Sequence, residues 1–194
     1  MHEHNVPEWF IDSCKKIKYL FPKGHAVAYV TMALRVAWYK VHEPLAYYAA
    51  YFTVRGDGFD AATMLIDPET IRQKIREVKE ADTKASAREQ QQVTALELVL
   101  EMNMRGFKFL PCDLYKSDVR RFLIEDGGLR CPFISLGGLG LSAAEAIVRE
   151  RDKAPFLSVE DLKERAKVSS AVVELLRSHG SLESLSETSQ VSMF

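Results

Sequence analysis

LGGLGLSAAEAIVRER, residues 136–151, is the stretch on which the interpretation of this sequence depends. Gly138 and Gly140 flank one apolar residue, and we expect a helix to begin at about Ser142. Residues at helical spacing give this helix one apolar face, formed by Ala144, Ile147 and Val148. The pattern therefore predicts a tight glycine turn that leads directly into a helix.

A glycine turn of this spacing is typical of a helix-hairpin-helix element. Its glycines let the backbone approach a phosphate, and the amides at the helix N-terminus donate to the phosphate oxygens without any side-chain charge. We therefore predict DNA contacts at four residues of the turn, Gly138, Gly140, Leu141 and Ser142. A turn that only packs two helices remains an alternative. A dinucleotide-binding loop is disfavoured, because position 143 is alanine and the strand before the turn is short.

The segment from Phe156 to Leu185, FLSVEDLKERAKVSSAVVELLRSHGSLESL, resembles a second, degenerate copy of the hairpin. Ser158 is expected to cap one helix, residues 167–169 to form the turn, and residues 170–178 to form the second helix. Because paired hairpins contact both strands of a duplex, Lys167 and Ser169 join the predicted DNA contacts. Residues 133–194 are slightly acidic, so we expect modest, salt-dependent affinity for DNA.

The residues upstream of the hairpins are expected to be mostly helical. Residues 26–42 are apolar on nearly every face, which is typical of a helix buried among several neighbours, although this chain offers few elements to supply them. Asp67 before Pro68 predicts one helix start, and Ser86 with Glu89 predicts a capping box at another.

From residue 107 the pattern changes to short apolar or alternating runs. These runs, FKFLPCDLYKSD and RFLIEDGGLRCPF, surround Gly127 and Gly128 and predict a small β-hairpin. We place the start of a second domain here.

Composition argues against several classes of protein. The net charge of −1 provides no global basic field, so binding to nucleic acid has to depend on local geometry. Cys14, Cys112 and Cys131 form no CxxC pair, which disfavours a zinc site or a disulfide framework and favours the cytoplasm. No apolar run reaches the roughly 20 residues of a membrane span, and the first ten residues lack the features of a signal peptide.

Three separate stretches resemble one family, the PolC-type replicative DNA polymerase III alpha chain of bacteria. Residues 4–60 resemble its fingers region, and GFKFLPCDLYKSD, the glycine hairpin and the terminal QVSMF occur in that family in the same order. The resemblance covers essentially the whole chain and implies that Phe194 is the natural C-terminus. It also implies that palm, thumb, histidinol-phosphatase-like and exonuclease regions precede residue 1.

The resemblance implies a part in template-directed addition of deoxynucleotides. In the full-length enzyme Mg²⁺ is held by palm aspartates that this chain lacks, so we expect no cofactor, metal ligand, catalytic residue or independent activity here. Asp57 and Asp60 are expected to be turn residues. Similarity to the fingers implies that Tyr19 lies near the nascent base pair, and that Lys23 and His25 face the incoming deoxynucleoside triphosphate.

The last five residues resemble the pentapeptide that binds a sliding clamp. In that motif the glutamine hydrogen-bonds at the rim of a pocket and the apolar residues fill it. The predicted clamp contacts are Gln190, Val191, Ser192, Met193 and Phe194. The alternative is that the terminal apolar pair folds back onto its own domain.

The sequence thus predicts a mainly α fold in three parts. Residues 1–106 are the helical, C-terminal part of a fingers domain, residues 107–185 a duplex-binding domain with a small β-hairpin and tandem helix-hairpin-helix elements, and residues 186–194 a flexible tail. The expected partners are primer-template duplex, the sliding clamp (beta subunit) and, in the full-length enzyme, a deoxynucleoside triphosphate, with no membrane. A free-standing, non-catalytic DNA-binding adaptor is the alternative, which helix 26–42 argues against because an adaptor would lack its packing partners.

Overall fold

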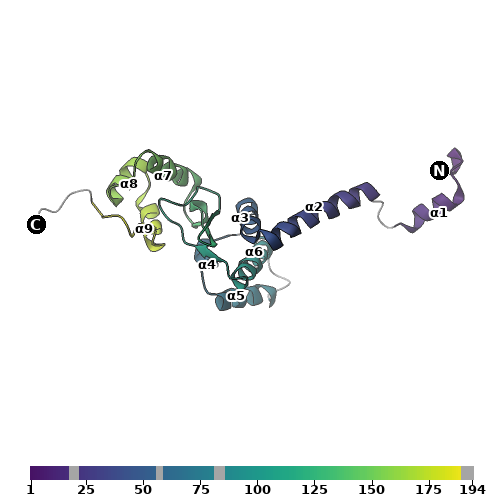
Figure 1. Ribbon diagram of the computed structural model, residues 1–194, viewed down its shortest axis with the longest axis horizontal. Helices are drawn as coiled ribbons and strands as arrows, with labels where there is room; N and C mark the ends of the chain where they lie inside the picture. Colours follow the sequence, from purple (N-terminus) through teal and green to yellow (C-terminus); the bar gives the residue numbers. More distant parts are fainter. Residues whose placement is uncertain (18–21, 56–58, 81–85, 189–194) are drawn as a thin grey trace, which may run out of the picture. The chain divides into compact units, whose positions relative to one another are not determined.

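Figure 1 shows the computed structural model, which describes residues 1–17, 22–55, 59–80 and 86–188. The fold is mainly α with one small three-stranded sheet, as predicted. The chain divides into two compact units, residues 1–42 and residues 43–194. Both predicted hairpins belong to the second unit.

The first unit is helical. Its elements are the 3₁₀ turn η1 (His2–His4), α1 (Glu8–Lys16) and α2 (Lys23–His42). The prediction of a helix over residues 26–42 is confirmed, but the prediction that this helix is buried is wrong in this structure. No residue of α2 is buried, and Tyr29 and Leu34 are 67% and 69% exposed. A helix that is apolar on every face needs neighbours on every side, and the described residues do not cover it.

The second unit begins with four helices, and the starts of the last three are capped by side chains. They are α3 (Pro44–Arg55), α4 (Ala61–Met64), α5 (Pro68–Glu80) and α6 (Ala87–Met104). The Thr70 amide donates to Asp67 Oδ1 at 3.0 Å at the start of α5. The predicted capping box of Ser86 and Glu89 is present at the start of α6. The helix starts predicted at Asp67 and at Ser86 are therefore confirmed.

Aromatic side chains form much of the core of this unit. Tyr48 and Phe52 on α3 are fully buried. Burial, together with the hydrogen bond of 3.0 Å that its hydroxyl donates to Glu101 Oε1, raises the pKa of Tyr48 to about 12. Four rings from distant segments contact one another edge-on or tilted, those of Phe52, Phe59, Phe109 and Phe122. This cluster fixes α3 to the sheet.

The sheet consists of β1 (Lys108–Leu110), β2 (Leu123–Glu125) and β3 (Gly128–Arg130), in the order β1-β3-β2. The predicted hairpin is the antiparallel pair β2–β3, in which Ile124 lies opposite Leu129. Its turn residues Asp126 and Gly127 both have positive φ, which suits a two-residue turn. The sequence did not predict that β1 pairs in parallel with β3, with Phe109 opposite Leu129.

The remaining elements carry the two hairpins. They are the 3₁₀ turn η3 (Phe133–Ser135), α7 (Leu141–Lys153), α8 (Val159–Ala166) and α9 (Ser170–Ser178). Helix α7 begins one residue earlier than predicted, whereas the predicted cap Ser158 stands directly before α8. Ser169, predicted as a turn residue, also caps α9. Figure 1 shows these three helices grouped at the C-terminal end of the described chain. Their shared core consists of residues with at most 1% exposure, Leu136, Ala144, Ile147, Leu162 and Leu176.

Candidate nucleic-acid interface

The first hairpin presents glycine backbone to solvent. Gly138 has φ of +100°, a conformation that disfavours any residue with a Cβ, and Gly138 and Gly140 are both exposed. Between them Leu139 is only 5% exposed and packs into the core. One apolar side chain therefore anchors the loop to the core, while the glycine backbone of the loop is exposed to solvent.

The second hairpin repeats this backbone arrangement. Lys167 has φ of +51°, Val168 is 5% exposed, and Ser169 precedes helix α9. The residue before each second helix has nearly the same conformation, with φ, ψ of −71°, 153° at Gly140 and −71°, 160° at Ser169. The degenerate repeat inferred from sequence is thus present in the backbone as well.

The two hairpins differ in how their helix N-termini are satisfied. At α9 the Val172 amide donates to Ser169 Oγ at 3.3 Å. At α7 the preceding residue is Gly140, and no side chain caps the helix. The amides of the first helical turn have no acceptor within their own helix. The amides of Leu141 and Ser142 at the start of α7 are therefore suited to an external anion, with the helix dipole behind them.

Two half-buried arginines hold the hairpin helices in place, and neither was singled out from the sequence. Arg151 at the end of α7 is inserted into the preceding loop, where Nη1 donates to the main-chain oxygens of Leu114 and Ser117 at 2.8 and 2.7 Å. Arg165 on α8 donates to the main-chain oxygen of Ala154 at 2.8 Å and lies over a phenylalanine ring in the same linker. The signal in the sequence was a basic residue in the last turn of each helix.

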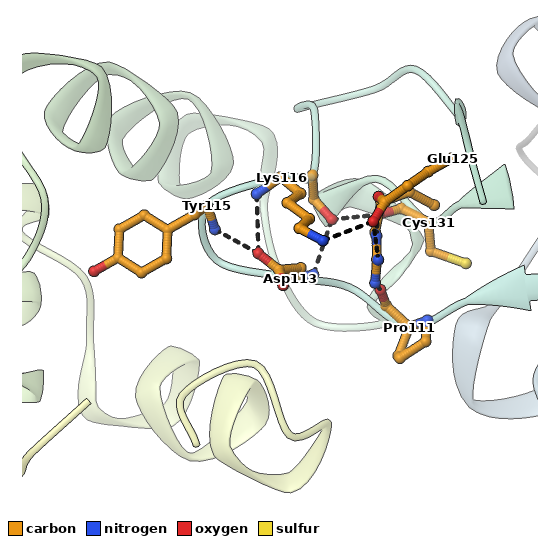
Figure 2. A network of polar contacts seen from close by, with 8 residues as sticks. Pro111, Asp113, Tyr115, Lys116, Glu125 and Cys131 are labelled. Carbon is orange, nitrogen blue, oxygen red and sulfur yellow. Dashed lines mark hydrogen bonds and ion pairs between the residues drawn. The ribbon is translucent and has the colours of Figure 1, made fainter. Parts of the chain in front are cut away.

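The loop of residues 111–118, part of the stretch GFKFLPCDLYKSD, supports both hairpins. Tyr115 and Lys116 amides donate to Asp113 Oδ1 at 2.8 and 2.9 Å, which closes the loop into a turn (Figure 2). The Tyr115 hydroxyl donates to the oxygen of Phe156 at 3.1 Å, near the start of the second hairpin. This motif therefore has a structural role, as a support for the predicted interface.

An ion-pair network fixes the same loop to the sheet. Arg130 makes two hydrogen bonds to the Glu125 carboxylate, at 2.9 and 2.7 Å, and a third to the main-chain oxygen of Pro111 at 2.8 Å. Lys116 Nζ contacts the same carboxylate at 2.8 Å (Figure 2). The hydrogen bonds from Arg130 and then Lys116 hold the pKa of Glu125 at about 2.

The predicted nucleotide contacts are not gathered into a site by the described residues. Tyr19 lies outside the residues that the structure describes. Lys23 and His25 are exposed at the start of α2, two positions apart, so they project from different sides of the helix. The His25 ring lies 4.3 Å from that of Tyr29, measured between centroids. The roles of these three residues remain predictions.

The predicted clamp contacts, residues 190–194, also lie outside the described residues. Residues 186 and 187, shortly before them, are described, and they pair with the start of α8. The amide of Val159 donates to the main-chain oxygen of Ser186 at 2.9 Å. No signal in the sequence pointed to this pairing.

Asp60 and Cys112 belong to residue types that often take part in catalysis or metal binding, but here their surroundings indicate structural roles. Asp60 caps α4 by accepting from the Thr63 amide at 3.1 Å, as expected of a turn residue, while Asp57 lies outside the described part of the chain. Among the described residues, no group of three or more His, Cys, Asp or Glu is placed to hold a metal ion. Burial raises the pKa of Cys112 to about 11, so its thiol is unreactive at neutral pH. No helix in the described ranges is long and apolar enough to cross a membrane.

Comparison with known proteins agrees with the geometry of the hairpins. A family model described as "Helix-hairpin-helix motif" matches residues 106–191. This range contains the sheet, the supporting loop and helices α7, α8 and α9.

The whole chain is also similar to curated bacterial proteins. It is 55% identical over 194 residues to a protein named DNA polymerase III PolC-type from Thermotoga petrophila, and 50% identical over 194 residues to one of the same name from Bacillus subtilis. In both alignments all of this chain is covered, and it spans 14% of the length of the relative. The chain is therefore a homologue, over its full length, of a segment of the PolC-type DNA polymerase III chains, and its residues 106–191 contain a helix-hairpin-helix motif.

Proposed function

We propose that this chain is the part of a replicative DNA polymerase that grips duplex DNA and attaches to a sliding clamp. In this proposal the tandem hairpins hold the sugar-phosphate backbone of the primer-template duplex without reading its sequence. The observation that supports this proposal most directly is made at the first hairpin, where exposed glycines precede a helix N-terminus without a side-chain cap. Exposed α2 also favours part of a larger enzyme over a free-standing adaptor, because its apolar surface needs partners.

The duplex grip is tested by giving the first hairpin the cap of the second, with the substitution Gly140→Ser. A Cβ at Gly140 meets no atom within 4 Å, so the protein has room for the side chain. We expect the serine to cap α7 by accepting from the Ala143 amide, as Ser169 does from that of Val172, and to stabilise the fold by a few tenths of a kcal/mol. We expect duplex binding to weaken severalfold, because the added side chain obstructs the close approach of a phosphate to the glycine backbone. Fluorescence anisotropy with a labelled duplex measures the affinity, and thermal unfolding measures the stability. Unchanged affinity in a folded variant would refute the grip at this hairpin.

The clamp attachment is proposed to reside in residues 190–194. Glutamine at the rim and the apolar pair Met193 and Phe194 in the pocket fit the clamp-binding pentapeptide, with methionine replacing the commoner leucine at similar volume. Such a short peptide binds weakly by itself, but tethering to a DNA-bound protein raises its effective concentration. Met193→Ala with Phe194→Ala should abolish retention on immobilised clamp and leave affinity for bare duplex intact. Full retention of the double variant would contradict this role.

The fingers segment is proposed to contribute contacts to the incoming deoxynucleoside triphosphate through Tyr19, Lys23 and His25. Cations offset phosphate charge and an aromatic ring stacks on a base, so the residue types suit the ligand. The chemistry of nucleotide addition, with its Mg²⁺, is proposed for the longer polymerase alone. Replacing Lys23 with glutamine in such a polymerase should raise KM for the nucleotide, and an unchanged KM would argue against the contact.

A further inference from the structure

The segment that leads to the clamp motif is attached to the hairpin domain. Ser186 forms a parallel bridge with Ser158, directly before α8. The amide of Val159 donates to the main-chain oxygen of Ser186 at 2.9 Å, and the amide of Glu160 donates to the main-chain oxygen of Glu187 at 3.2 Å. Two amides at the N-terminus of α8 are thus satisfied by the main chain of this segment.

A side-chain contact reinforces this attachment. Nη2 of Arg177 on α9 lies 2.8 Å from each carboxylate oxygen of Glu187, and the same guanidinium pairs with Glu174 one turn earlier. Because Arg177 and Glu187 are 40% and 68% exposed, the ion pair adds only a modest free energy. The main-chain bridge therefore provides most of the attachment, and the ion pair fixes its register.

We propose that Ser186 and Glu187 stay attached to α8 and α9 while the tail binds a sliding clamp, so that the clamp is held close against this edge of the domain. The inference rests on the clamp attachment proposed above. Gln190 is three residues after Glu187, and three extended residues span about 10 Å. A tail that is free from Leu185 onward would instead have five residues and reach about 17 Å.

A short tether has two effects on the complex. It limits the orientations in which the hairpins and the clamp can share one duplex. It also raises the effective concentration of the motif at the clamp, by about twofold if concentration falls as the −3/2 power of tether length. In this arrangement the edge formed by Val159, Glu160 and Arg177 lies next to the bound clamp.

The test is a disulfide that prevents the segment from leaving α8. Bridged partners lie about 4.8 Å apart in neighbouring strands, within the roughly 4.4–6.8 Å that a disulfide accepts between Cα atoms. Ser158→Cys and Ser186→Cys are therefore combined in a Cys14→Ser background, with buried Cys112 and Cys131 left in place. Clamp affinity is measured for the oxidised and reduced forms of this variant by surface plasmon resonance.

We expect the oxidised form to bind the clamp within about twofold of the reduced form. A tenfold or larger loss on oxidation that reductant restores would show that the segment must detach, and would overturn the inference while leaving clamp binding established. Adding Met193→Ala and Phe194→Ala to the locked variant should remove binding. If the unlocked parent chain does not bind the clamp at all, the proposed attachment fails, and the inference fails with it.

Hydrogen exchange provides an independent readout without substitutions, because Ser158 also caps α8 and its replacement costs stability. The amides of Val159 and Glu160 should remain equally protected in the free chain and in the clamp complex. Loss of their protection on clamp binding would overturn the inference. Protection retained in the complex, together with tight binding by the oxidised variant, would support it.

Discussion

Gly140 and Ser169 have nearly the same backbone conformation at the start of their helices, yet only the serine has a side chain that accepts a hydrogen bond from an amide of the helix that it precedes. The two hairpins are therefore alike in shape and different in chemistry. The first places the amides of Leu141 and Ser142 after a glycine without a side chain, whereas the second places a lysine at its tip, next to a helix with a side-chain cap. This difference makes the contribution of each hairpin to duplex binding separable by substitution.

Replacing Lys167 with glycine should separate binding from stability at the second hairpin. Lysine at φ of +51° is strained, so glycine should stabilise the fold or leave it unchanged, by at most about 1 kcal/mol. If Lys167 contacts a phosphate, duplex affinity falls and the slope of log K against log salt concentration decreases by about 0.9. Lys153→Ala, at the far end of α7, is the control that should bind as the parent does. An unchanged salt slope for Lys167→Gly would remove this residue from the interface.

Replacing Glu125 with glutamine should destabilise the sheet and its loop. The substitution leaves Arg130, which is only 9% exposed, with a weakened partner, and we expect a loss of about 2–3 kcal/mol in urea unfolding at pH 7. Glu69→Gln, in an exposed pair with Arg72, should cost less than about 1 kcal/mol. Equal effects of the two substitutions would contradict the structural role of the network.

The same carboxylate should make stability depend on pH. The folded-state pKa of Glu125, about 2, lies below that of an unfolded glutamate. Its contribution is therefore complete above about pH 5 and is lost as the pH falls toward 2. Unfolding curves of the parent and of Glu125→Gln should converge over this range, and a constant difference between them down to pH 2 would count against the assignment.

Limited proteolysis should remove the first unit before the hairpin domain. Ile11 is its only buried residue among those described, and no residue of α2 is buried. Residues 107–185 belong to the continuous core of the second unit, which starts at residue 43, and they should survive within a resistant fragment that is identified by mass spectrometry. Early cleavage between residues 107 and 185, with residues 1–60 intact, would contradict this order.

The chain by itself should not extend a primer. Two-metal nucleotide addition depends on clustered carboxylates, and Asp60 instead caps α4. A primer-template incubated with the chain, deoxynucleoside triphosphates and Mg²⁺ should remain at its original length on a denaturing gel, while a complete PolC-type polymerase extends it. Metal-dependent elongation by the purified chain would overturn this expectation.

Local chemistry in the sequence predicted most of the fold. The capping box at Ser86, the cap at Ser158 and the turn at Gly127 depend on residues close in sequence, and all are present. The parallel pairing of β1 with β3 joins residues about 20 positions apart, so neither periodicity nor turn chemistry could reveal it. Burial of α2 was predicted wrongly: the apolar pattern shows that the helix needs partners, and this chain, as its sequence indicated, has few elements to supply them.

The predicted hairpin residues could be checked in part, because glycine and capping patterns specify backbone conformation directly. Gly138, Gly140 and Lys167 lie where the turns require them. The contacts that support the interface could not be derived from the sequence, although a basic residue in the last turn of α7 and of α8 was visible there. Arg151 satisfies the main-chain oxygens of a loop more than 30 residues away, and such a contact depends on tertiary packing alone.

The buried side chains of Leu139 and Val168 have a consequence for the thermodynamics of association. Because each loop is already seated in the core, it is preorganised, and a duplex can dock without first ordering it. Docking on exposed backbone also removes little apolar area from water. Calorimetry should accordingly record a small heat-capacity change, as for a rigid body meeting a rigid body, rather than the large negative value that accompanies folding on contact.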